Sequence, residues 1–252
     1  MTTTQPLTLI TGANRGMGFE LAKELGAKGQ RILLGARDPE KGAAAVSQLE
    51  HDGIDASLIE LDVTNSQSVE NAAEMITKTF GYLDILINNA GAVFDAFQQP
   101  SVVNPDQLRQ DFELNYFGVV NMCQAFLPLL KAAPKAKVIN ISSMMGSITS
   151  ALDPETNVYR AVAVGYQSAK AAVNMYTVQL AKEMTRDNLP ITVNAIDPGM
   201  VATEFGGATP EQAQAMGARP IPEGVARTIE LATDPDDTSN ATFTNTDGVV
   251  AW

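Results

Sequence analysis

The 252-residue chain is poor in the residues that most often bind metals or form disulfides, with one cysteine and one histidine. The single cysteine, Cys123, excludes an intramolecular disulfide and favours a reducing, cytoplasmic compartment. Because His51 is also alone, no histidine- or thiolate-based metal site is expected. The net charge of −12 disfavours nucleic acid as a partner, since its phosphates would repel the protein surface.

The chain also lacks any apolar run long enough to cross a membrane, and its first residues have neither region of a signal peptide. We therefore expect no membrane partner. Apolar residues make up 45% of the sequence, which is enough to form the core of one α/β domain over residues 1–252. We find no internal repeat, low-complexity tract or linker.

Short apolar runs alternate with helix-length segments along the whole chain. The runs are rich in Val, Ile and Leu, as expected of strands buried on both faces of a parallel sheet. Strand after helix after strand predicts such a sheet with helices covering both faces. The expected strands span residues 7–10, 32–34, 58–61, 83–88, 138–141 and 191–196.

Helix starts are indicated by capping residues. Asp38 precedes Pro39, and Gly81 is placed to end the helix that begins near residue 66. Two regions, 147–160 and 206–222, are rich in small residues and proline, and we expect loops over a site there, or plain surface insertions. Capping boxes are predicted for Thr64 with Gln67, Asn104 with Gln107, and Thr209 with Gln212.

The first expected strand runs directly into a glycine-rich loop, which a helix follows. Glycines allow the backbone to approach a pyrophosphate, and the helix N-terminus meets that anion with free N–H groups. A loop at this position predicts a dinucleotide-binding, Rossmann-type doubly wound fold. The candidate cofactor-binding residues are Gly12, Asn14, Arg15, Gly16, Met17 and Gly18.

The spacing Thr-Gly-x-x-x-Gly-x-Gly resembles the cofactor loop of the short-chain dehydrogenase/reductase family, in its non-extended branch. The second strand of such folds ends beside the adenosine ribose, where an acid selects NAD. Here Ala36 stands at that place and Arg37 follows it. Arg15 and Arg37 are a pair suited to the extra phosphate of NADP(H), unless they are ordinary surface arginines.

A tyrosine and a lysine lie four residues apart, so they share one face of a helix. The ammonium of Lys170 is expected to lower the pKa of Tyr166. Tyr166 is then suited to give a proton to a carbonyl oxygen, or to take one from an alcohol. Tyr159, the other tyrosine nearby, has no such lysine partner.

The resemblance implies further site residues. Ser143, the second serine of Ser-Ser-x-x-Gly, corresponds to the family's substrate-polarising serine, and Asn115 to its water-holding asparagine. Asp62 and Val63 match an adenine-contacting turn, although Asp62 is equally suited to start a turn. Segments that line the cofactor cleft and the nicotinamide correspond to Asn89, Ala90, Gly91, Pro198, Gly199, Val201 and Thr203.

These motifs predict an NADP(H)-dependent oxidoreductase of the carbonyl reductase type, acting on a small aldehyde or ketone. Its catalytic residues would be Asn115, Ser143, Tyr166 and Lys170, without a metal. An alcohol dehydrogenase working oxidatively, or a non-catalytic NADP(H)-binding regulator, is the alternative. The long spacing between Ser143 and Tyr166 resembles an insertion of some carbonyl reductases and favours a monomer or homodimer.

The two irregular regions carry apolar side chains and are expected to form the walls of the substrate pocket. An apolar or aromatic substrate is therefore expected, unless these side chains only anchor the loops. The side chains in or next to these regions are Met144, Met145, Ile148, Leu152, Met200, Phe205 and Met216, and Phe94 and Phe97 are expected to add to the same pocket.

Overall fold

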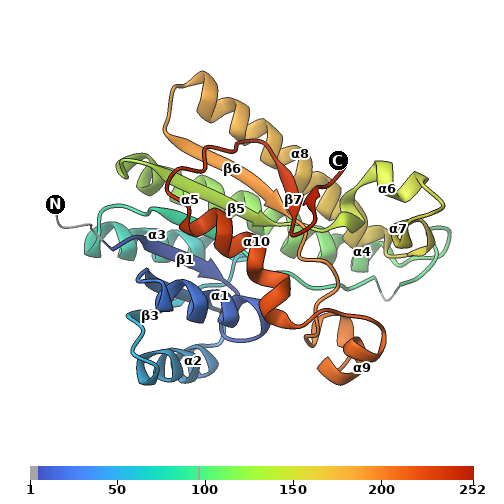
Figure 1. The fold of residues 1–252 in the computed structure, drawn as a ribbon, viewed down its shortest axis with the longest axis horizontal. Coiled ribbons are helices and arrows are strands. Elements are labelled where there is room, and N and C mark those ends of the chain that lie inside the picture. Colours follow the sequence, from blue (N-terminus) through green and yellow to red (C-terminus); the bar gives the residue numbers. More distant parts are fainter. Residues whose placement is uncertain (1–4, 96) are drawn as a thin grey trace.

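The computed structural model describes residues 5–95 and 97–252, which form one α/β unit around a single sheet (Figure 1). The strand order in these residues is β3-β2-β1-β4-β5-β6-β7-β8, parallel throughout except for the final antiparallel pair. The predicted doubly wound fold is confirmed. The strands are β1 (Leu7–Thr11), β2 (Arg31–Ala36), β3 (Ala56–Glu60), β4 (Ile85–Asn88), β5 (Ala136–Ile141), β6 (Ile191–Ile196), β7 (Phe243–Asn245) and β8 (Gly248–Val249).

Helices cover both faces of the sheet. One face packs against α1 (Gly16–Ala27), α2 (Pro39–His51) and α10 (Ile221–Thr233). The other face packs against α3 (Ser66–Thr79), α5 (Gly118–Ala132) and α8 (Val164–Arg186). The smaller elements are α4 (Pro105–Phe112), the π-helical turn η1 (Glu113–Phe117), η2 (Met144–Gly146), α6 (Ile148–Leu152), α7 (Asn157–Arg160), η3 (Phe205–Gly207) and α9 (Pro210–Ala215).

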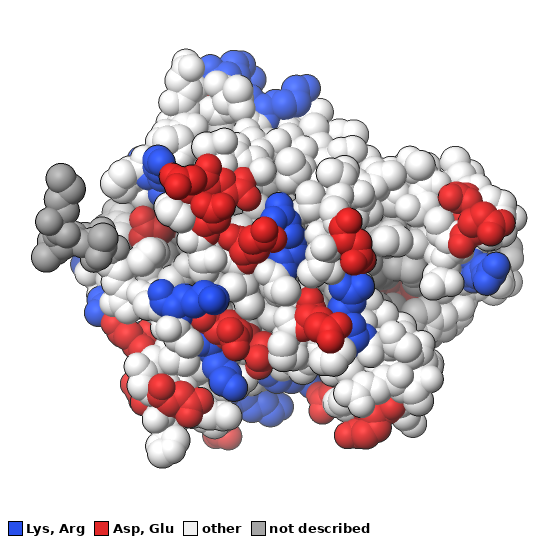
Figure 2. Space-filling model, in the orientation of Figure 1, with Lys and Arg blue, Asp and Glu red and all other residues white. Residues whose placement is uncertain are grey.

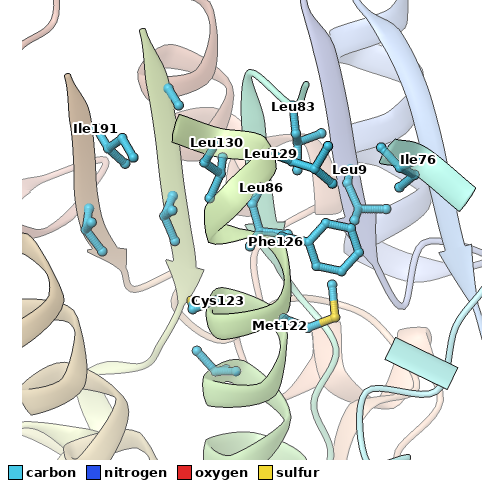
Figure 3. Packing of buried hydrophobic residues seen from close by; sticks show 14 of the residues in the cluster. Leu9, Ile76, Leu83, Leu86, Met122, Cys123, Phe126, Leu129, Leu130 and Ile191 are labelled. Carbon is cyan, nitrogen blue, oxygen red and sulfur yellow. The ribbon is translucent and has the colours of Figure 1, made fainter. Parts of the chain in front are cut away.

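The continuous apolar runs are explained by burial on both faces. In β2, Ile32 and Leu34 face one core cluster, and Leu33 faces the other, as the period of a strand requires. Figure 3 shows Phe126 of α5 packed among strand side chains, including Leu9. Because helices bury both faces of the sheet, these strands need no polar face.

The edge strand β3 departs from the expected burial. Ser57 and Glu60 are exposed, while Ile59 is buried. No strand pairs with β3 on its outer side within the described residues. An edge strand keeps one row of side chains in contact with solvent, so the expectation of full burial was wrong here.

The helix caps confirm part of the sequence prediction. Asp38 accepts a hydrogen bond from the N–H of Lys41, and the capping box of Thr209 is formed. The box expected at Thr64 is wrong, because Asn65 caps α3 by accepting from the N–H of Ser68. Asn104 does cap α4, but it accepts from the N–H of Asp106, not from Gln107 as a box requires.

The two regions expected as loops are partly helical. Residues 147–160 contain α6 and α7, and residues 206–222 contain α9 and the start of α10. Ser147 and Thr156 cap the first two of these short helices with their side chains. Figure 1 shows α6, α7 and α9 at the end of the molecule toward which the parallel strands point.

Charged residues of both signs lie on the face of the molecule drawn in Figure 2. Figure 2 shows basic side chains scattered among the acidic ones on the face drawn. In residues 5–95 and 97–252 we find no helix with the length and apolarity that a bilayer crossing needs. The lone Cys123 is buried, and its pKa is raised by burial, so its thiol is a core side chain as expected.

Candidate active site

The glycine loop leaves the end of β1 and opens directly into α1. Gly12 and Gly16 have φ angles of 63° and 57°, a conformation that favours glycine. A Cβ at Gly18 would lie 2.5 Å from the carbonyl oxygen of Gly12 and 2.6 Å from Nδ2 of Asn89. Helix α1 begins without a side-chain cap or an acidic residue in its first turn. Its N–H groups therefore suit an anion such as a pyrophosphate.

The end of β4 holds this loop in place. Nδ2 of Asn89 donates to the carbonyl oxygen of Thr11 at 2.9 Å. The Thr11 hydroxyl accepts from the N–H groups of Asn89 and Ala90, each at 3.0 Å. The Asn-Asn-Ala-Gly segment thus joins the cradle to β4, the neighbouring strand of the sheet.

Three predicted catalytic residues meet at the carboxyl end of β5. Ser143 follows this strand, and Tyr166 and Lys170 lie in the first two turns of α8. The tyrosine and the lysine are buried, with 8% and 4% of their surface exposed. A Cβ at Gly146 would lie 2.6 Å from the backbone of Lys170, so only glycine lets the serine segment pack this closely on α8.

Burial governs the protonation of this pair. The pKa of Tyr166 is raised by burial, against the lowering effect of its hydrogen bond with Ser143. Burial lowers the pKa of Lys170 to about 8. The expected lowering of the phenol pKa by the lysine is therefore not what this structure shows. The ammonium donates to the carbonyl of Ile141 at 2.7 Å, and its nitrogen is 5.6 Å from the centre of the phenol ring.

Asn115 lies in the π-helical turn between α4 and α5 and has no exposed surface. Its Nδ2 donates to the carbonyls of Ala92 and Asp111, at 2.8 and 2.9 Å. Its Oδ1 accepts from the N–H of Ala92. A Cβ at Gly91 would lie 2.9 Å from that oxygen and 3.8 Å from Nζ of Lys170. The asparagine is thus beside the lysine, with its side chain fixed by the backbone.

An aspartate to which the sequence analysis assigned no role organises the segment after β6. Asp197 is buried, and its Oδ1 accepts from the N–H groups of Met144 and Gly199, at 2.9 and 3.2 Å. Its Oδ2 accepts from Nδ2 of Asn245 at 3.4 Å. It therefore joins the serine segment to the Pro-Gly turn. The sequence signal was an acid at the end of an apolar strand, directly before Pro198.

Residues 203–207, which we call the strap, lie between the glycine loop and Tyr166. Thr203 lies beside Gly16, and Glu204 forms an ion pair with Arg15. The ring of Phe205 meets that of Tyr166 edge to face, with 5.5 Å between their centres. At the outer end, a Cβ at Gly206 would lie 3.7 Å from the ring of Phe97.

The remaining predicted residues differ in their burial and in their contacts. Arg15 and Arg37 are both exposed near the glycine loop. Asp62 accepts from the N–H and the hydroxyl of Thr64, which is the turn-starting role given as its alternative. Val201 is buried and forms a bridge with Arg219. None of the described residues forms a cluster of three or more metal-ligating side chains.

The fold and the site together define the class of protein to which this chain belongs. A doubly wound sheet, a glycine loop opening into α1, and a buried tyrosine–lysine pair on α8 define a dinucleotide-binding oxidoreductase. The comparisons identify the family. A family model described as short chain dehydrogenase matches residues 6–214, and the chain belongs to that family.

Individual relatives share most of the chain. A short-chain dehydrogenase of Penicillium roqueforti is 39% identical over 226 residues, covering 86% of this chain and 87% of the relative. A (+)-neomenthol dehydrogenase of Arabidopsis thaliana is 30% identical, covering 90% of this chain and 91% of the relative. The NADPH-bound carbonyl reductase from chicken fatty liver matches with a TM-score of 0.84 at 27% identity, covering 98% of this chain and 99% of the other.

Proposed function

We propose that this protein reduces an aldehyde or ketone to an alcohol with NADPH. The observation that carries the proposal is the meeting of Ser143, Tyr166 and Lys170 at the edge of the sheet where β1 also ends in the glycine loop. The chicken relative is a carbonyl reductase with NADPH bound. When bound, NADPH supplies a hydride to the carbonyl carbon.

The phenol of Tyr166 is the proton donor in this proposal. Its raised pKa keeps it protonated, mainly because it is buried. It gives its proton to the substrate oxygen, which also accepts from the hydroxyl of Ser143. Because the pKa of Lys170 is about 8, its ammonium is populated at neutral pH and stabilises the phenolate that remains. Asn115 fixes the backbone beside the lysine.

The glycine loop would hold the pyrophosphate of the cofactor. Gly12, Gly16 and Gly18 leave the backbone bare, and α1 begins without a competing side-chain cap. Arg37, and Arg15 once it leaves Glu204, would bind the 2′-phosphate. The place where an acid would hold the ribose hydroxyls of NAD(H) is occupied by Ala36, which supports NADP(H) over NAD(H).

The remaining predicted contacts line the same cleft in this proposal. The adenine would lie near Asp62 and Val63, and the cleft wall includes Asn89, Ala90 and Gly91. The nicotinamide would lie against Pro198, Gly199, Val201 and Thr203.

Oxidation of an alcohol is the second candidate, because the Arabidopsis relative is a dehydrogenase of the alcohol neomenthol. The same groups serve that direction, with the ionised Tyr166 taking the proton.

The test is the loss of reduced-nicotinamide absorbance with a panel of aldehydes, ketones and quinones, run with NADPH and NADH in parallel. We expect turnover with NADPH and little with NADH. Tyr166→Phe should lower turnover by about a thousandfold or more, as loss of a general acid does, with an unchanged Kd for NADPH. Tyr159→Phe is the matched control, because Tyr159 is an exposed tyrosine of the short helix α7. Tight NADPH binding without turnover of any carbonyl would instead favour a regulatory protein.

A further inference from the structure

Two carboxyl groups with no exposed surface lie beside the first turn of α8. Asp111 comes from α4, and Asp95 comes from the loop after β4. Across the described residues, neither of them forms a salt bridge with a basic side chain. A buried charge without a cation is costly, so this pair requires an explanation.

The two carboxyl groups differ in how they are satisfied. Asp95 uses both oxygens, accepting from the N–H of Phe97 at 3.1 Å and from the N–H of Gly165 at 2.9 Å. Asp111 accepts from the N–H of Phe94 through Oδ1, at 3.1 Å. Its Oδ2 is buried and has no hydrogen-bond partner. Because this oxygen has no donor, the ionised form of Asp111 is less stabilised than that of Asp95.

The pKa of Asp111 agrees with this difference. Burial raises its pKa to about 6, against the lowering effect of the Phe94 N–H, and the nearby Asp95 raises it further. Tyr166 of α8 also lies within electrostatic range of it, because the charge of Asp111 raises the pKa of that phenol. On its own helix, Asp106 and Arg109 are exposed and paired with each other.

Asp111 lies beside two of the three segments that hold the proposed catalytic residues, namely α8 and the π-helical turn η1. A Cβ at Gly165 would lie 2.5 Å from its Oδ2, and Tyr166 is the next residue in the chain. Its backbone carbonyl accepts from Nδ2 of Asn115. Asp111 itself is not placed to contact a substrate, so its effect must pass through these neighbours.

We propose that Asp95 and Asp111 are a positioning pair for Tyr166. Asp95 anchors the first turn of α8 through the N–H of Gly165, and a proton on Asp111 determines how readily Tyr166 gives up its own. This inference rests on the proposed function of Tyr166. Burial is the main cause of the raised pKa of the phenol, and the charges of Asp197 and of ionised Asp111 raise it further. Ionised Asp111 therefore weakens proton donation.

The test compares Asp111→Asn, which is neutral at every pH, with the wild type between about pH 4 and pH 8. Its first readout is the Tm. The folded-state pKa of Asp111 lies above its usual 3.8, so its contribution to stability is present below that value and is lost as the pH rises through about 6. The variant should therefore be more stable than the wild type at pH 8, and this advantage should disappear toward pH 4. Glu113→Gln, an exposed carboxyl two residues away, should show no such trend.

The second readout is the pH profile of kcat for carbonyl reduction. In the wild type, kcat should fall by about threefold or more as Asp111 ionises, with an unchanged KM. In Asp111→Asn the profile should lose that step. Asp95→Asn has one acceptor oxygen for two N–H donors, so it should lower both Tm and kcat at every pH.

Two results would overturn the proposal. One is a Tm difference between wild type and Asp111→Asn that does not depend on pH, and the other is an unchanged step in the kcat profile. If the wild type turns over no carbonyl, the proposed function fails. The Tm comparison then decides by itself whether Asp111 holds a proton.

Discussion

Replacing Gly18 by alanine tests the cofactor cradle most directly. The added Cβ would lie 2.5 Å from the Gly12 carbonyl oxygen and 2.6 Å from Nδ2 of Asn89, with Cα of Ala13 at 2.8 Å. Overpacking of this kind costs about 1–3 kcal/mol. The better helix propensity of alanine offsets at most about 1 kcal/mol. A net loss of up to about 2 kcal/mol lowers the Tm of a chain this size by about 4–8 °C.

The effect on cofactor binding should exceed the effect on stability. The crowded atoms belong to the loop that would hold the pyrophosphate, so relieving the contact moves the cradle itself. We expect the Kd for NADPH, measured by fluorescence titration, to rise about tenfold or more, since each factor of ten is only about 1.4 kcal/mol.

Gly29→Ala provides the matched control. Gly29 has a φ of 86° and no neighbour within 4 Å of an added Cβ. Its replacement should cost about 1–2 kcal/mol through backbone conformation alone, with an unchanged Kd. An unchanged Kd in Gly18→Ala, at a lowered Tm, would refute the placement of the pyrophosphate.

Three further predictions concern single side chains. Arg37→Ala should raise the Kd for NADPH about tenfold and leave that for NADH unchanged, and equal losses for both would contradict the phosphate role. Asp197→Asn should lower the Tm by several degrees and also lower kcat, because leaving a buried polar group unsatisfied costs about 1–3 kcal/mol of stability. Thermal melts and initial rates check this. Lys170→Met should abolish turnover, and its Tm relative to the wild type should fall as the pH rises from about 7 to about 10. The reason is that the folded-state pKa of Lys170, about 8, is depressed, so its contribution to stability is lost as the pH falls through that value; a pH-independent difference would argue against this.

The central strands of the sheet could be predicted from the sequence because they are buried on both faces. Their Val, Ile and Leu runs stand out from the helices between them. Strands β7 and β8 left no such signal, because Phe243–Asn245 is short and mostly polar. They form because β7 pairs with β6 and β8 pairs with β7, which depends on the tertiary fold. Helices α6 and α7 were missed for a related reason, since a helix of one turn depends on a single cap such as Ser147.

The site was predicted unevenly, and burial explains the difference. Tyr166 and Lys170 have a helical spacing that distinguishes them along the chain, and Ser143 was predicted from its resemblance to a family motif. Asp95 and Asp111 have no such spacing, and in the sequence they read as ordinary surface acids. Only the packing of α4 against α8 removes them from solvent. The same holds for the raised pKa of Tyr166, because desolvation cannot be read from residue order.

The strap limits how independently the cofactor-binding part and the catalytic part of the site can change by substitution. The glycine loop that would hold the pyrophosphate precedes residue 19, whereas Ser143, Tyr166 and Lys170 come much later in the chain. Substitutions confined to one end should combine additively with substitutions confined to the other. A change within the strap cannot be local in this way, because Glu204 pairs with Arg15 at one end and the ring of Phe205 meets that of Tyr166 at the other. In an evolving lineage or a designed library, these few positions are where cofactor choice and substrate choice must be altered together.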